Sequence, residues 1–144
     1  MNATEHSYTL DSTLESLDKA EAAARVIARK AGFHEEDSAH ISLAVREATA
    51  NAVLHGNACD PHKHVTVQFK TAPESFTVRV QDEGKGLDTA AIPDPLAQHN
   101  QLKESGRGIF LIRAFMDEVY FDNINPGAQI TMIKRVRKPR GRAK

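Results

Sequence analysis

Apolar residues recur at helical spacing in two stretches of the first 56 residues. In residues 14–33 the apolar positions lie three or four apart with charged residues between them: Leu14, Leu17, Ala20, Ala24 and Ile27. This period predicts an amphipathic helix that ends near Gly32. A second helix is predicted from about Glu36 to His55, and it too ends at a glycine, Gly56.

Strand-like patterns follow in the second half of the chain. Apolar and polar residues alternate in residues 65–70 and 76–81, which predicts a hairpin with one buried face. A second hairpin is predicted for residues 118–123 and 128–136, because an Asn-Pro-Gly turn separates them. Residues 6–13 are typical of a short strand.

The segment between the two hairpins has no sustained period. Residues 83–106 contain Gly84, Gly86 and two prolines, and a helix is predicted only from Gly108 onward. A loop of this length is too long for an ordinary connection and is usually functional or mobile.

Length and composition narrow the class of protein. The chain has 144 residues, 40% apolar and 26% charged, which predicts one globular domain and excludes a collagen-like or wholly disordered chain. No apolar run approaches the roughly 20 residues needed to span a bilayer, and the polar start has no signal-peptide core. We therefore expect a cytoplasmic protein without a membrane anchor. The single cysteine, Cys59, cannot form an internal disulfide.

The formal net charge of zero conceals a segregation of charge along the chain. Residues 134–144 hold seven basic side chains and no acidic one, which leaves 12 basic against 19 acidic groups elsewhere. A body of −7 is thus balanced by a C-terminal segment of +7. Such a segment can act as an interaction tail, but without aromatic residues for base stacking we do not expect it to bind nucleic acid directly.

Polar residues form a stripe on the second predicted helix. Glu47, Asn51 and His55 lie four residues apart, so at about 100 degrees per residue their side chains share one face. On its own such a stripe is typical of a solvated helix face. Glu47 could equally be a surface carboxylate paired with Arg46 or with a nearby lysine.

Two glycine pairs come after this helix. Gly84 and Gly86 follow Asp82 at the end of a predicted strand, and Gly106 and Gly108 flank the start of the last helix. Glycines let a backbone approach a ligand closely and leave amide groups free to bind phosphate. Either pair alone would also suit an ordinary turn.

The order of these motifs resembles an ATP-binding superfamily shared by gyrase, heat-shock chaperones, histidine kinases and mismatch-repair proteins. Residues 46–56, REATANAVLHG, resemble its N box, and residues 82–86 and 106–112 resemble its two glycine boxes. Within that superfamily the chain most resembles the free-standing bacterial anti-sigma-factor serine/threonine kinases.

The resemblance implies an α/β sandwich in which helices cover one face of a mixed, largely antiparallel sheet. It implies a single ATP-binding domain over residues 1–135 with a lid at about 83–106. The charge pattern adds a basic tail over 136–144, which we expect to be disordered. ATP and Mg²⁺ are the expected cofactors.

The resemblance also assigns roles to the residues of the N box. Glu47 would lie beside the γ-phosphate and accept the proton of the acceptor hydroxyl. Asn51 would bind Mg²⁺, a hard ion that takes oxygen ligands. His55 would either contact phosphate or close the helix.

The glycine boxes would hold the two ends of the nucleotide. Asp82 would accept a hydrogen bond from the adenine amino group, while Gly84 and Gly86 let the chain pass close to the ring. The second box would supply backbone amides and a guanidinium to the phosphates: Gly106, Arg107 and Gly108.

The function implied is a protein kinase that binds a sigma factor and phosphorylates an antagonist of the anti-sigma factor, acting as a homodimer. The alternative is a non-catalytic ATP-binding switch that sequesters a partner protein. A zinc site is a third possibility for one cluster, although its spacing matches no standard pattern: His55, Cys59, His62 and His64.

Overall fold

The computed structural model describes residues 3–86 and 104–136, without the side chains of 104–107. Its elements are, in chain order, β1 (Thr4–Asp11), α1 (Glu15–Lys30), α2 (Glu35–Ala50), η1 (Asn51–Gly56), β2 (His64–Ala72), β3 (Ser75–Gln81), α4 (Glu104–Phe115), β4 (Glu118–Asn123) and β5 (Ala128–Arg135). The five strands of the described residues form one sheet in the order β1-β2-β3-β5-β4.

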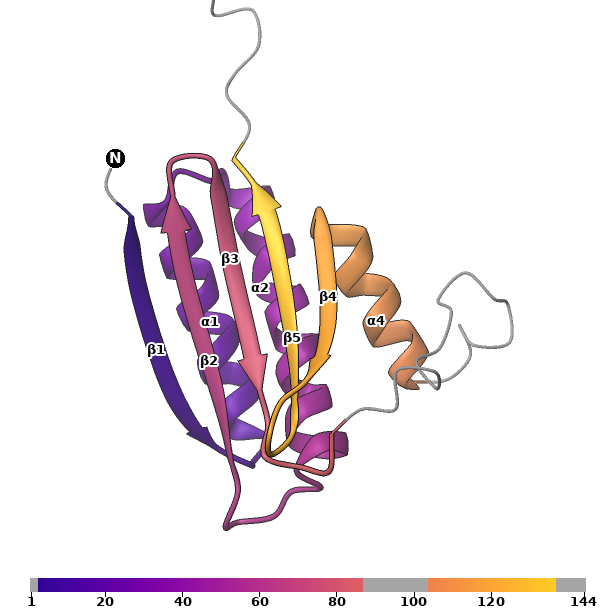
Figure 1. Cartoon of the computed structure of the whole chain (residues 1–144). Coiled ribbons are helices and arrows are strands. Elements are labelled where there is room, and N and C mark those ends of the chain that lie inside the picture. Colours follow the sequence, from indigo (N-terminus) through magenta and orange to yellow (C-terminus); the bar gives the residue numbers. More distant parts are fainter. Residues whose placement is uncertain (1–2, 87–103, 137–144) are drawn as a thin grey trace, which may run out of the picture.

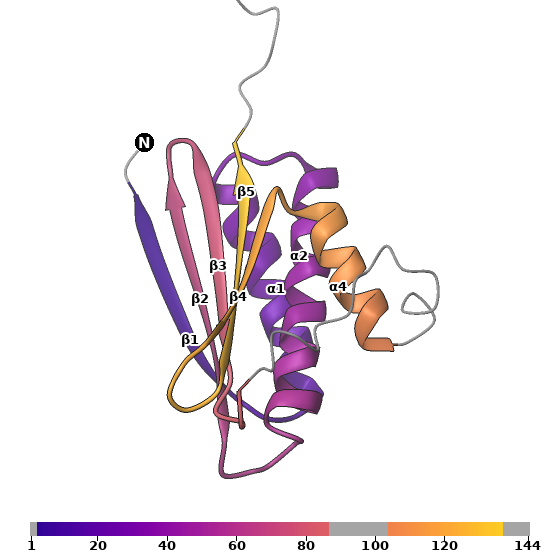
Figure 2. The ribbon, with the colours of Figure 1, turned by 45° about the vertical axis from the view of Figure 1, so that its right-hand side comes forward.

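The helices and the sheet form two layers. Helices α1, α2 and α4 all lie on one face of the sheet, as the two views of the ribbon show (Figures 1 and 2). This confirms the expected α/β sandwich. Every strand pairing among the described residues is antiparallel, so the sheet is not mixed as expected. Strand β5 lies between β3 and β4 and runs antiparallel to both, so β3 and β4 do not pair directly.

The helix-facing side of the sheet supplies much of the core. Val65, Val67 and Phe69 alternate with half-buried polar residues on β2, and each is fully buried. Phe69 faces Val78 on β3, which in turn faces Met132 on β5. The predicted hairpin is therefore confirmed in its period, and burying each large apolar side chain contributes about 2 kcal/mol before entropy is counted.

Helix α1 presents its predicted apolar face to this core, with one exception. Leu17, Ala20, Ala24 and Ile27 are buried, but Leu14 is 62% exposed. The helix begins only at Glu15, which leaves Leu14 at the N-cap, outside the helical repeat.

The second predicted helix has the expected extent but two geometries. Helix α2 passes directly into η1, a π-helix, and the backbone N–H of Asn57 donates to the carbonyl of Ala52 at 2.8 Å. This five-residue spacing is that of a π-turn, which is frequent at functional sites. Residues after Ala50 therefore do not follow the 100-degree repeat used to predict the stripe.

The end of β3 and the turn between β4 and β5 lie at the same end of the sheet as η1 (Figure 1).

Helix α4 begins at Glu104, so both glycines of the second box lie inside the helix and not before it. Residues 87–103 and 137–144 lie outside the described residues, so the lid, the tail and the domain limits stay predictions. None of the described helices is long and apolar enough to cross a bilayer.

Candidate functional site

Asp82 directly follows β3 and is the only buried charged side chain among the described residues, with 8% of its surface exposed. Its Oδ1 accepts hydrogen bonds from the backbone N–H groups of Gly84 at 2.9 Å and Ala128 at 3.1 Å. Its own N–H donates to the carbonyl of Ala128 at 3.0 Å. These bonds fix the carboxylate, and Oδ2 lies against Gly56. Asp82 is thus an oriented acceptor, as reading a base requires.

Three glycines make this close packing around Asp82 possible. A Cβ on Gly56 would overlap the Asp82 carboxylate, and a Cβ on Gly84 would overlap the Gly56 carbonyl oxygen. A Cβ on Gly127 would overlap the Asp82 carbonyl oxygen. The ends of η1, β3 and the β4–β5 turn therefore converge on one carboxylate only because all three positions lack a side chain.

The two glycines of the first box differ in environment. Gly84 is buried against Gly56, whereas Gly86 is exposed and has a φ of 92°, in the left-handed region that favours glycine. The first is needed for close approach and the second for backbone conformation.

Gly108 of the second box, on α4, packs against two residues of the polar stripe, Glu47 and Asn51. Gly108 is buried, and a Cβ there would lie 3.0 Å from Oε1 of Glu47 and 3.9 Å from both amide atoms of Asn51. The structure therefore brings Gly108 against Glu47 and Asn51, although it lies far from both in the sequence. Gly106 and Arg107 lie in the first turn of α4, and the Arg107 side chain is outside the described residues. Its phosphate contact stays a prediction.

Arg46, the neighbour of Glu47, is engaged elsewhere. Its guanidinium donates to Asp18 at 2.6 Å and to Glu21 at 2.8 Å, both on α1. The hydrogen bond to Asp18, followed by that to Glu21, raises the pKa of Arg46 above its ordinary value. The Glu47 carboxylate has no hydrogen-bond or ion-pair partner among the described residues, so pairing with Arg46 does not account for it.

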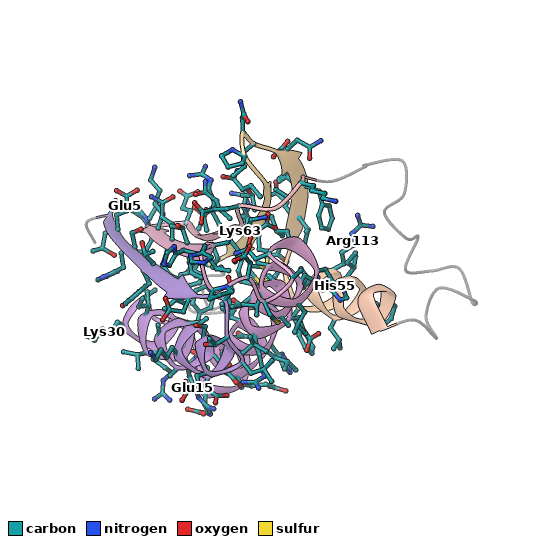
Figure 3. All side chains as sticks on the ribbon, turned by 90° about the horizontal axis from the view of Figure 1, so that it is seen from below. Glu5, Glu15, Lys30, His55, Lys63 and Arg113 are labelled. Carbon is teal, nitrogen blue, oxygen red and sulfur yellow. The ribbon has the colours of Figure 1, made fainter. Side chains whose placement is uncertain are left out.

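His55 is separated in environment from the other two residues of the stripe. Glu47 and Asn51 are half-buried beside Gly108, whereas His55 is exposed on the π-helical turn (Figure 3). The wider π-turn changes the direction of the side chains that follow Ala50. The structure brings Glu47 and Asn51 together at Gly108 and leaves the predicted role of His55 a prediction.

Sequence reasoning missed two residues beside Asp82. Gly127 carried only the signal of a turn, and Asn57 carried none beyond its place after Gly56. Asn57 is nevertheless 1% exposed and accepts a hydrogen bond from the backbone N–H of Glu83 at 2.7 Å. No local pattern reveals such a contact, because its partner lies 26 residues away.

The donor set of this region fits a nucleotide with a magnesium ion. At one end Asp82 offers a fixed carboxylate beside glycine backbone that leaves room for a ligand. At the other end Asn51 offers a half-buried amide oxygen, a ligand type that Mg²⁺ accepts while keeping several waters. For zinc, the described residues hold no group of three His, Cys, Asp or Glu side chains suited to a metal. The imidazole of His64 instead lies between two carboxylates, with Nε2 3.6 Å from Oδ1 of Asp11 and Nδ1 3.8 Å from Oε1 of Glu83.

Comparison with known proteins shows to which family a chain with these features belongs. Residues 10–134 match the family model of the histidine kinase-like ATPase domain. The anti-sigma F factor of Clostridium perfringens (strain SM101) is 33% identical over 105 residues, which cover 70% of this chain and 74% of that protein. The serine-protein kinase RsbW of Bacillus licheniformis is 31% identical over 120 residues, covering 79% and 74% of the two chains.

A solved structure shares the fold. The crystal structure of the RsbU and RsbW domains of a Mycobacterium tuberculosis protein superposes on 94% of this chain with a TM-score of 0.69 and 22% identity. This chain corresponds to 33% of that longer protein. The matched family segment contains every described element of the site, from the Glu47–Asn51 pair to Gly127. This chain belongs to the histidine kinase-like ATPase domain family.

Proposed function

We propose that this chain is an ATP-dependent serine/threonine protein kinase that also acts as an anti-sigma factor. Its relatives named serine-protein kinase RsbW and anti-sigma F factor support the two activities. The observation that supports the kinase activity is the contact of Glu47 and Asn51 with Gly108, in the second turn of α4. A carboxylate without a partner among the described residues is suited to accepting a proton and poorly suited to passive binding of an anionic ligand.

Glu47 is the proposed general base. The kinase reaction moves the γ-phosphoryl group of ATP to a serine or threonine oxygen, which loses its proton as the new P–O bond forms and the bond to ADP breaks. Glu47 would accept that proton, because its carboxylate lies against Gly108 of the second glycine box and forms no ion pair with Arg46. The backbone N–H of Gly106, in the first turn of α4, together with the guanidinium of Arg107, would hold the phosphates.

The other end of the site would select the base. Asp82 would accept a hydrogen bond from the adenine amino group through the carboxylate that Gly84 and Ala128 orient. Gly84 and Gly86 leave room for the ring. Asn51 would hold Mg²⁺, which when bound neutralises charge on the phosphates.

The partners follow from the names of the relatives. We propose that the chain binds a sigma factor and phosphorylates the protein that antagonises this binding, in the cytoplasm and as a homodimer. Sedimentation equilibrium would test the dimer, since a monomer at micromolar concentration would contradict it.

A substitution at Glu47 tests the kinase proposal. Glu47→Gln keeps the size of the side chain but removes the base, so we expect phosphorylation of the cognate antagonist to fall by roughly 10²- to 10⁴-fold. ATP affinity is expected to stay the same or to rise slightly, because a negative charge beside the phosphates is removed. Radiolabel transfer from ATP and calorimetry measure the two quantities.

The matched control is Glu36→Gln, an exposed acid at the start of the same helix. It should change neither quantity. If the wild-type chain binds ATP but labels no antagonist, the chain is the non-catalytic switch instead. Full transfer by Glu47→Gln would exclude Glu47 as the base.

A further inference from the structure

Asn57 is a buried polar side chain beside the nucleotide site for which the functions above give no role. It follows Gly56 at the end of η1, and only 1% of its surface is exposed. A buried amide is costly unless its donors and its acceptor are all hydrogen-bonded. Those of Asn57 are: Nδ2 donates to Ser12 Oγ at 2.9 Å and to the His64 carbonyl at 3.0 Å, and Oδ1 accepts from the Glu83 N–H at 2.7 Å.

The two ends of this amide bind different parts of the fold. The donors hold Asn57 to Ser12, which precedes α1, and to His64, the first residue of β2. The acceptor oxygen holds Glu83, in the loop that follows β3. The side chain is therefore anchored on one side by the scaffold and holds the first glycine box on the other.

The held peptide is the one that carries Asp82. A peptide unit is planar, so a hydrogen bond to the Glu83 N–H also orients the carbonyl group and Cα of Asp82. The next N–H, that of Gly84, binds Oδ1 of Asp82 at 2.9 Å. Consecutive backbone donors thus connect Asn57 to the Asp82 carboxylate.

We propose that Asn57 is a positioning residue for the nucleotide base. Its carboxamide oxygen holds the Asp82–Glu83 peptide so that the Asp82 carboxylate favours adenine over guanine. The inference rests on the proposed function, in which Asp82 reads the adenine amino group. Asn57 itself does not touch the nucleotide; it acts through Asp82.

The ratio of the ATP and GTP dissociation constants separates this role from a merely structural one. ATP and GTP carry the same triphosphate, so effects on charge and on general stability cancel in the ratio. Asn57→Leu has a similar shape and removes the oxygen that holds Glu83. Ser12→Ala is the control, because it removes one anchoring partner of Asn57 and leaves the contact with Glu83.

Calorimetry on the full chain with Mg²⁺ gives both constants for each variant at a temperature where it is folded. We expect Asn57→Leu to lower the ATP preference roughly tenfold, the scale of one unmet buried hydrogen bond. Ser12→Ala should lower the melting temperature but keep the preference within about twofold. Asn57→Asp retains an oxygen for Glu83, so it should largely preserve the preference.

Three outcomes overturn the proposal: an unchanged preference in Asn57→Leu, an equal loss in Ser12→Ala, or rapid hydrogen exchange of the Glu83 amide in the wild-type chain. If Asn57→Leu does not fold, Asn57→Ala replaces it, and the exchange measurement needs no variant. A wild-type chain that binds neither nucleotide overturns the proposed function itself. If the wild-type chain prefers ATP and Asn57→Leu keeps the same preference, only the role of Asn57 is overturned.

Discussion

At the scale of single residues, the site depends on three glycines that have no Cβ atom. Gly56, Gly84 and Gly127 allow three segments to meet at Asp82, because a Cβ at any of them would overlap a neighbouring oxygen. Gly84 belongs to a motif visible in the sequence, and Gly127 to a visible turn. That Gly84 packs against Gly56 and Gly127 against Asp82 was not predictable, since a sequence pattern shows which backbone conformation a glycine permits but not what approaches it.

Gly56 and Gly32 make a matched pair for substitution by alanine. Gly56→Ala places a methyl group against the Asp82 carboxylate, so we expect it to weaken ATP binding roughly tenfold or more by displacing that acceptor. Gly32 has a φ of 106° but no atom within 4 Å of a Cβ. Gly32→Ala should therefore cost about 1 kcal/mol of unfolding free energy and leave ATP affinity unchanged.

Calorimetry and urea unfolding measure these two effects. An ATP affinity in Gly56→Ala equal to that of the wild type would show that the carboxylate at Asp82 does not contact the nucleotide.

At the scale of elements, the apolar periods predicted most of the helices and strands. The β2–β3 hairpin and the face of α1 follow from alternation and from a helical repeat, because each needs only one side to be buried. The start of α4 and the π-turn of η1 did not follow. Both segments contact parts of the chain that are distant in sequence, Gly56 of η1 with Asp82 and Gly108 of α4 with Glu47, and a local period does not show such contacts.

Neighbouring residues on α1 test the assigned face. Ile27 is 5% exposed and Val26 is 53% exposed. Ile27→Ala should lower the free energy of unfolding by about 2–5 kcal/mol, because it leaves a cavity in the core. Val26→Ala should change it by less than about 0.5 kcal/mol, since the side chain is in solvent and alanine favours a helix.

Chemical denaturation of both variants gives these values. Similar losses from the two substitutions would mean that α1 does not present the predicted face to the sheet.

At the scale of the whole molecule, the order of the chain separates parts that the fold brings together. The N box, the first glycine box and the β4–β5 turn all end at the same end of the sheet, because antiparallel strands return there repeatedly (Figure 1). The charges remain segregated in sequence. In the proposed function an acidic body binds an anionic nucleotide, and we expect the basic C-terminal segment to reduce that unfavourable field.

Removing residues 137–144 deletes five basic side chains and changes the net charge from zero to −5. We expect a few-fold slower association with ATP at low ionic strength, and no difference at about 1 M salt, where the Debye length is about 3 Å. Stopped-flow binding measures both rates. A chain in which a Gly/Ser segment of equal length replaces residues 137–144 is the control for chain length, and it should behave like the truncated chain. An association rate that does not depend on the tail at any salt concentration would contradict the charge argument.

The sequence by itself determined the class of fold, the apolar face of α1 and the hairpins, and it supplied the candidate residues of the site. These follow from hydrophobic period and from motif chemistry, which act over a few neighbouring residues. Only the tertiary structure decided that Gly108 meets Glu47 and Asn51, and that Asn57 holds the peptide after Asp82. Such contacts join residues that are distant in the chain, so they depend on how whole layers pack.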